Sequence, residues 1–117
     1  MLAPVALADV SWRSVAEGGR RAGPPSDPRY AATAYFAEDA LEDAFSVVLR
    51  CISAKTAEGS GAWQAELALL APETLPAIVA RLVADKRLLI TEGKRIVADC
   101  LVHSVRMVDT TQLPTAV

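Results

Sequence analysis

The sequence predicts a single all-β domain, and three observations carry that prediction. Residues 5–12 ("VALADVSW") and 45–52 ("FSVVLRCI") alternate apolar side chains with the period of two that a half-buried strand requires. Two apolar runs flank "TEGK" at 91–94, a pattern typical of a β-hairpin with Gly93 at positive φ. Residues 18–29 hold three glycines and three prolines, which predicts a wide loop.

Local residue patterns predict the first two strands and the nature of the segment after them. At 5–12 the side chains that share one face are Ala6, Ala8, Val10 and Trp12. The short stretch "YAATAYF" at 30–36 ends in aromatic residues and is expected to be a strand. An acidic cluster follows with helix-compatible spacing, and we interpret it as a solvated face or loop. Its members are Glu38, Asp39, Glu42 and Asp43.

The middle of the chain holds the clearest strand signal. Residues 45–52 are rich in β-branched side chains, and those on one face are Phe45, Val47, Leu49 and Cys51. The polar residues at 53–62 ("SAKTAEGSGA") predict a flexible connection. A further strand is expected at 63–70 ("WQAELALL"), and its inward residues are Ala65, Leu67 and Leu69.

One segment conflicts with a purely β pattern. After prolines that suit a first helical turn, apolar residues recur at helical spacing, namely Leu75, Ile78, Val79, Leu82 and Val83. A short helix is therefore expected near 75–84. The hairpin around Gly93 comes next. The last residues, 109–117, are expected to form a loose tail beyond a single domain that spans 1–108.

Length, composition and charge narrow the classes of function. The chain has 117 residues, which is enough for one domain with a core. Hydrophobic residues make up 52%, but 22 residues are alanine, and no window approaches the roughly 18 continuous apolar residues of a membrane helix. The N-terminus lacks the basic region of a secretion signal, so we expect a cytoplasmic location and no membrane partner. A net charge of −2 argues against nucleic-acid binding as the main function, because neutralising phosphates needs a basic surface.

Catalytic and metal chemistry are not expected. His103 is the only histidine and lies in an expected strand, without a plausible nucleophile–base pair. Cys51 and Cys100 are far apart in the sequence and are expected to be reduced core residues. With no clustered metal ligands and no Walker motif, we expect no enzyme activity, no metal and no other cofactor. Trp12 and Trp63 could anchor a protein partner, but core positions are the preferred interpretation.

Three motifs taken in order give a resemblance to a known family. They are "EGGRRAGPP" at 17–25, "YAATAYF" at 30–36 and "RLVADKRLLITEGKRIVADCLVHSV" at 81–105. Together they resemble the C-terminal β-barrel domain (domain 3) of translation elongation factor Tu and small free-standing bacterial proteins of that fold. The resemblance implies a closed or nearly closed barrel of six antiparallel strands, with the short helix near 75–84. Ala84 and Asp85 stand where the family has a Pro-Gly turn.

The same resemblance implies a binding site. In that family the barrel helps to hold the T-stem of aminoacyl-tRNA through the arginine loop, the strand after it and the Glu-Gly turn. These roles would fall on Arg20, Arg21, Thr33, Glu92 and Gly93, with phosphate contacts from Lys94 and Arg95. Arginine suits such contacts because its planar fork binds phosphate oxygens in pairs. The alternative interpretation is that the basic residues are solvated turn residues.

The sequence is compatible with three functions. The leading hypothesis is a non-enzymatic binding module with this barrel, acting by protein–protein contacts. The second is an RNA-binding module that engages tRNA or a structured RNA through the Arg20/Arg21 loop and the Glu92-Gly93 turn. The third is a toxin-neutralising, immunity-type protein, because a compact acidic domain is suited to covering a basic enzyme. The acidic cluster at 38–43 would repel RNA if it shared a face with the arginine loop.

Overall fold

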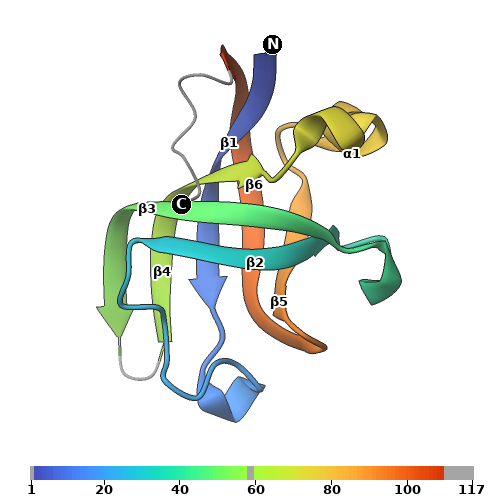
Figure 1. The fold of residues 1–117 in the computed structure, drawn as a ribbon. Coiled ribbons are helices and arrows are strands. Elements are labelled where there is room, and N and C mark those ends of the chain that lie inside the picture. Colours follow the sequence, from blue (N-terminus) through green and yellow to red (C-terminus); the bar gives the residue numbers. More distant parts are fainter. Residues whose placement is uncertain (1, 58–59, 110–117) are drawn as a thin grey trace.

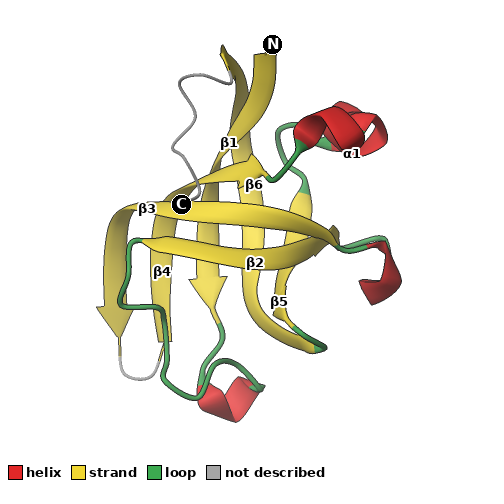
Figure 2. Cartoon of the chain, in the orientation of Figure 1, coloured by secondary structure: helices red, strands yellow, loops and turns green. Residues whose placement is uncertain are grey.

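Six strands in one antiparallel sheet form the protein (Figures 1 and 2). The computed structural model describes residues 2–57 and 60–109. Each strand pairs with two others, so that the order β1-β4-β3-β2-β5-β6 returns to β1 and closes the sheet as a barrel. An all-β fold with six antiparallel strands is thereby confirmed. The strands are β1 (Leu2–Trp12), β2 (Arg29–Phe36), β3 (Phe45–Ala57), β4 (Ser60–Leu69), β5 (Arg87–Glu92) and β6 (Arg95–Asp109).

The alternation of side chains places the core inside this ring of strands. Ala8 and Val10 of β1 point inward and are fully buried, as the sequence predicts. Leu67 of β4 is buried in the same core cluster. Trp12 and Trp63 are also buried there, with ring centroids 4.9 Å apart in an edge-to-face arrangement. Both tryptophans are therefore core residues.

The polar segment at 53–62 differs from its prediction as a flexible connection. β3 continues to Ala57 and β4 begins at Ser60, so most of the segment is strand. Residues 58–59 lie outside the described part of the chain. Ladder hydrogen bonds use only backbone groups, so a hairpin can extend beyond the core with polar side chains. The prediction was wrong because it relied on side-chain polarity.

The short helix lies on the connection between β4 and β5, in the region that the sequence indicates. α1 (Pro76–Arg81) follows the single 3₁₀ turn η3 (Pro72–Thr74), and Pro76 suits the first helical position. The helix ends before Leu82, whose backbone is extended and whose side chain is buried in the core. Burial of Leu82 therefore makes the helix shorter than the expected 75–84.

Two further 3₁₀ turns complete the connections, η1 (Val15–Glu17) and η2 (Leu41–Asp43). The acidic cluster lies on the loop after β2 and on η2, in agreement with the prediction of a loop. Residues 110–117, most of the expected tail, lie outside the described part. None of the helices within 2–57 and 60–109 is long and apolar enough to cross a membrane.

Replacing Ala71 by glycine is expected to raise the free energy of unfolding by up to about 1 kcal/mol. Ala71 has a φ of 56°, a left-handed conformation in which a Cβ is strained and glycine is not. The matched control is Ala77→Gly within α1, which is expected to lower the free energy of unfolding by roughly 0.5–1 kcal/mol. Urea denaturation measures both, and a change of the same sign in the two variants would contradict this account.

Candidate functional site

A capped turn and two glycines hold the loop that precedes β2. Ser14 and Glu17 form a capping box around η1, in which each side chain accepts a hydrogen bond from the backbone N–H of the other. Gly18 follows with a φ of 87°, which glycine adopts without strain. A Cβ at Gly19 would lie 2.0 Å from a backbone carbonyl oxygen, so only glycine fits there. These contacts fix the path of the backbone up to Arg20.

Arg20 and Glu92 meet in space although they are far apart in the sequence. Arg20 Nε donates to Glu92 Oε2 at 3.1 Å, and Arg20 Nη1 donates to the Gly23 carbonyl oxygen at 2.7 Å. The Tyr30 hydroxyl donates to the same carboxylate, and the Arg20 guanidinium lies 5.3 Å from the Tyr30 ring centroid. Arg20 and Glu92 therefore bind each other, and each has fewer free hydrogen-bonding groups to offer a ligand.

Thr33 is engaged within the sheet. Its Oγ1 lies 2.6 Å from Oγ1 of Thr91, its register partner on β5. Thr91 is fully buried, and Thr33 is half-buried. Threonine pairs directly across two strands stabilise a sheet through their hydroxyl groups. The Thr33 hydroxyl is thus committed to this pair.

Arg21, Lys94 and Arg95 are the exposed basic residues of the predicted site. Gly93 has a φ of 58° and forms the turn that the sequence predicts. Arg95 Nη1 donates to a carbonyl oxygen of the η1 loop at 3.5 Å. Among the described residues, none of these three cations has an ion-pair partner. A shallow hollow of about 460 Å³ is lined by Glu92, Lys94 and Arg95.

The acidic cluster lies at the other end of β2. Tyr30, which contacts Glu92, is near the start of β2, and the acidic loop begins directly after Phe36 at its end. β5 runs antiparallel beside β2, with Phe36 opposite Leu88. The cluster and the Arg20 loop therefore occupy different ends of these strands.

Arg81 joins the acidic loop to α1. Its Nη1 and Nη2 donate to the two Asp39 carboxylate oxygens at 2.7 and 3.1 Å, and Nη2 also reaches Glu38 at 3.2 Å. The guanidinium lies 4.2 Å from the Phe36 ring centroid, within the range of a cation–π contact. Lys86 makes a second ion pair with Glu38 at 3.5 Å. The hydrogen bond from Arg81 lowers the pKa of Asp39, so this carboxylate is ionised at neutral pH.

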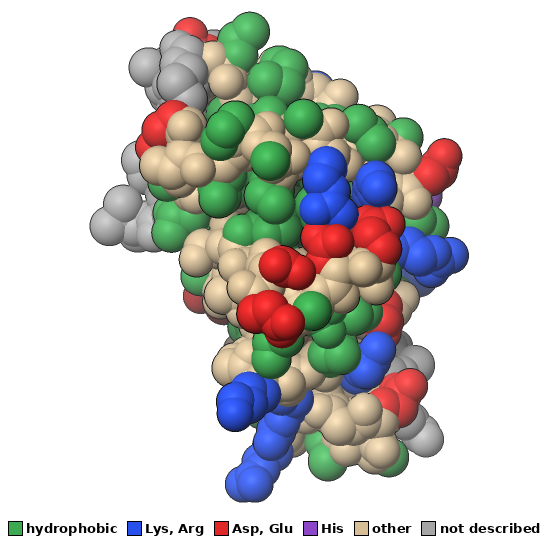
Figure 3. Space-filling model, turned by 90° about the vertical axis from the view of Figure 1, so that its right-hand side faces the viewer, with side chains coloured by type: hydrophobic (Ala, Val, Ile, Leu, Met, Phe, Trp, Pro, Cys, Tyr) green, Lys and Arg blue, Asp and Glu red, His purple; other side chains and the backbone are tan. Residues whose placement is uncertain are grey.

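A hydrophobic surface adjoins this ion-pair network. Figure 3 shows hydrophobic side chains gathered over the upper part of the face, with acidic side chains directly beneath them. Leu70 and Val83 are about half exposed, and α1 itself presents mainly alanine and proline outward. We call the exposed apolar residues of the connecting segment 70–83 the α1 face, and they are Leu70, Ala71, Pro76, Ala77, Ala80 and Val83.

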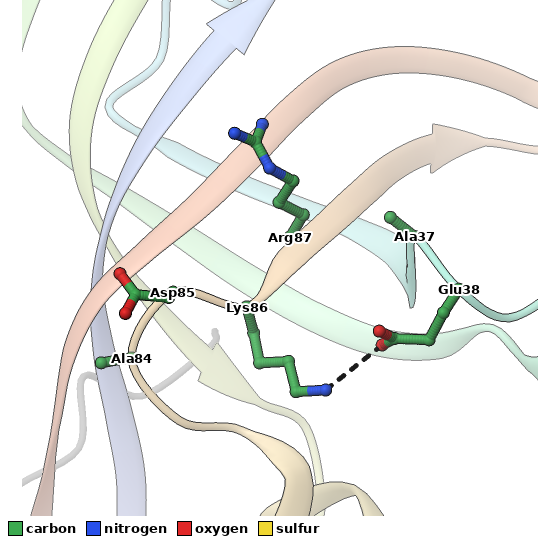
Figure 4. Close-up of a pocket in the computed structure, with 6 residues that line it drawn as sticks. All are labelled: Ala37, Glu38, Ala84, Asp85, Lys86 and Arg87. Carbon is green, nitrogen blue, oxygen red and sulfur yellow. Dashed lines mark ion pairs between the residues drawn. The ribbon is translucent and has the colours of Figure 1, made fainter.

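A second hollow, of about 590 Å³, opens beside the same network (Figure 4). In Figure 4, Lys86 and Glu38 point toward one another, whereas Asp85 and Arg87 point away from that pair in different directions. The charged side chains that line this hollow therefore do not converge on one point.

Reactive side chains are dispersed over the structure. His103 Nε2 lies 2.6 Å from Asp9 Oδ2 on the outer surface, and both side chains are about half exposed. Burial raises the pKa of Cys100 to about 12, with a further contribution from Asp9, so this thiol stays protonated. Cys51 is also a free thiol, and burial raises its pKa. Across the described ranges, no group of three His, Cys, Asp or Glu side chains could hold a metal ion.

Sequence reasoning missed the α1 face and the Arg81 network. Arg81 and Asp39 are far apart in the sequence, and no local pattern pairs them. One signal was present in the helical segment. A surface helix normally presents charged residues outward, but here the exposed helical positions are Pro76, Ala77 and Ala80.

Tyr30 is expected to make the protein less stable at alkaline pH. Burial raises the pKa of Tyr30, and its hydrogen bond to Glu92 raises it further, whereas an unfolded tyrosine ionises near pH 10. Above about pH 10 the unfolded chain loses a proton that the folded protein keeps, so the free energy of unfolding falls as pH rises. Urea denaturation between about pH 9 and pH 11 should show a smaller decline in Tyr30→Phe than in wild type. Equal declines would contradict the assignment, and Tyr35→Phe is the matched control.

Comparison with known proteins identifies no relative of this chain. No protein-family model, curated protein or solved structure matches it. The geometry of the chain presents two candidate surfaces, the Arg20–Glu92 end of the barrel and the α1 face.

Proposed function

We propose that the chain is a non-enzymatic binding module that acts through protein–protein contacts, and that the α1 face is its contact surface. The observation that carries the proposal is an exposed apolar surface bordered by the Arg81 ion-pair network (Figure 3). This surface has the anatomy that protein interfaces share, an apolar centre with a charged rim.

The exposure of large apolar side chains supports this role. Leu70 is 51% exposed and Val83 is 48% exposed, and small apolar residues of α1 lie between them in the sequence. Soluble monomers rarely expose contiguous apolar patches larger than roughly a few hundred Å², and patches above that size mark interaction sites. Arg81 and Asp39 fix the border of the patch by a two-pronged ion pair. A partner that covers the α1 face would remove this apolar surface from water.

The surrounding charge favours a basic partner. The β2–β3 and β4–β5 connections carry six acidic and two basic side chains, so acidic charge is in excess there. The acidic residues are Glu38, Asp39, Glu42, Asp43, Glu73 and Asp85, and the basic ones are Arg81 and Lys86. Complementary potentials steer association and reject partners of like charge. The expected partner is a protein whose apolar contact surface is flanked by lysine or arginine. A toxin-neutralising, immunity-type protein that covers a basic enzyme is one form of this function.

Kinship with the translation-factor barrel is part of the same proposal. The six-strand ring and the Gly93 turn support it. Asp85 has a φ of 69°, the conformation that glycine would take in the Pro-Gly turn of that family. One barrel architecture serves many tasks, so the binding role rests on the α1 face and not on the kinship.

Site-specific photo-crosslinking tests the protein-binding role. A benzophenone amino acid at Val83 is expected to give a discrete protein adduct in an extract of the source cells. The matched control places it at Ile52, which is 52% exposed on β3 and outside the α1 face. Charge reversal by Glu42→Lys with Asp43→Lys should reduce the Val83 adduct about tenfold, because it removes the attraction for a basic partner. The proposal would be contradicted if Val83 and Ile52 gave equal labelling. It would also be contradicted if charge reversal left the yield of the Val83 adduct unchanged.

A second candidate function is RNA binding at the opposite end of β2. It is favoured by three exposed cations, Arg21, Lys94 and Arg95, which have no ion-pair partner in the described part of the chain. Its test is a mobility-shift titration against total tRNA at about 50 and 200 mM salt, which separates phosphate-driven binding from other contacts. This function predicts saturable binding that weakens steeply with salt and is lost in Arg20→Ala/Arg21→Ala. No shift at the lower salt concentration would exclude it.

A further inference from the structure

Two arginines bind one buried carboxylate on the outside of the barrel, and a third arginine lies opposite one of them. Glu66 on β4 accepts hydrogen bonds from Arg50 on β3 and from Arg106 on β6. Arg29 on β2 is the register partner of Arg50, and Arg50 is the register partner of Glu66. Leu49 points into the core, so Arg50 and the residues paired with it point outward. The arginines therefore form one stripe across the outer surface.

The pairing of Arg29 with Arg50 is unfavourable for the fold itself. Residues directly opposite on antiparallel strands have Cβ atoms about 4.5–5.5 Å apart, and like charges at such positions destabilise a sheet. Within the described residues, the Arg29 side chain takes part in no hydrogen bond or ion pair. The Asp27 carboxylate is close by, but it accepts from the Arg29 backbone N–H. The ion pairs with Glu66 compensate the charges of Arg50 and Arg106. Within the described residues, no such partner compensates the charge of Arg29.

Glu66 holds its two arginines in a fixed arrangement. Burial alone would raise the pKa of Glu66, but the hydrogen bonds from Arg50 and Arg106 outweigh it and lower that pKa. The Glu66 side chain is only 10% exposed, whereas those of Arg50 and Arg106 are 48% and 59% exposed. A guanidinium has five N–H donors, so the contacts to Glu66 leave donors on both arginines directed to solvent. The exposed guanidinium groups are thus ordered before any ligand arrives.

We propose that Arg29 and Arg50, with Arg106 beside them, form a binding site for phosphate groups. A phosphate between Arg29 and Arg50 would offset their mutual repulsion and accept paired hydrogen bonds from the planar guanidinium groups. Glu66 acts as a positioning residue, because it orients Arg50 and Arg106 without reaching the ligand. The site uses none of the α1 face residues and none of Arg20, Arg21, Lys94 and Arg95, and it does not depend on the functions proposed for those residues.

NMR titration of the arginine Nε–H signals tests this site. The probes are inorganic phosphate, pyrophosphate and a single-stranded oligouridylate of about eight nucleotides, at about 50 mM salt. At least one probe is expected to shift the signals of Arg29 and Arg50. Arg29→Ala should weaken its binding about tenfold, because charge-assisted hydrogen bonds are lost. Arg87→Ala is the matched control, since Arg87 is an exposed arginine elsewhere, and it should leave the affinity unchanged.

The variants keep the test independent of folding. Arg29→Ala leaves both ion pairs of Glu66 intact, and Arg50→Lys keeps a cation beside Glu66 while it removes the planar fork. Both should weaken binding. Equal affinity for pyrophosphate and oligouridylate would assign free phosphates as ligand, and a preference for oligouridylate would assign a nucleic-acid backbone. The proposal is overturned if no probe binds, if Arg29→Ala has no effect, or if Arg21→Ala abolishes binding instead.

Discussion

Closure of the sheet is the constraint on which the rest of the structure depends. Because β1 pairs with β6 as well as with β4, every strand uses both of its edges and the interior becomes a small enclosed volume. A narrow barrel must combine large and small side chains inside, because its interior has little space. The small positions are filled by alanine, and those fully buried are Ala6, Ala8, Ala34, Ala65 and Ala98. These buried alanines, which weaken the strand signals in the sequence, thus meet a packing requirement.

The two ends of the barrel are closed by different means, and the candidate surfaces follow from that difference. At one end, Trp12 packs edge to face on Tyr30 and Trp63, with ring centroids 5.1 and 4.9 Å away. Tyr30 in turn supports the pair of Arg20 and Glu92. At the other end, the chain that connects β4 to β5 packs its inner side on the core and leaves its outer side as the α1 face. Each surface is therefore the exterior of a group that seals the core.

Local sequence patterns predict the strands because a period of two decides which side chains face the core. The extension of β3 to Ala57 and the early start of β4 at Ser60 escape such patterns, since backbone pairing there needs no apolar signal. The candidate sites escape them for another reason. Arg20 with Glu92, and Arg81 with Asp39, become neighbours only when distant segments are brought together by the closed ring. A single sequence holds no record of such distances, so it could name Arg20 and Glu92 but could not show that they bind each other.

The pairing of β1 with β6 also constrains how the chain can fold during synthesis. Leu2 is the register partner of Asp109, so the first and last strands are joined along their length. While the ribosome is still producing the later strands, β1 can pair with β4 but its second edge has no partner. Contacts between distant segments form slowly, and open strand edges invite association with other chains. The barrel can therefore close only after β6 has left the ribosome, and the nascent chain must pass through a stage with an unprotected edge.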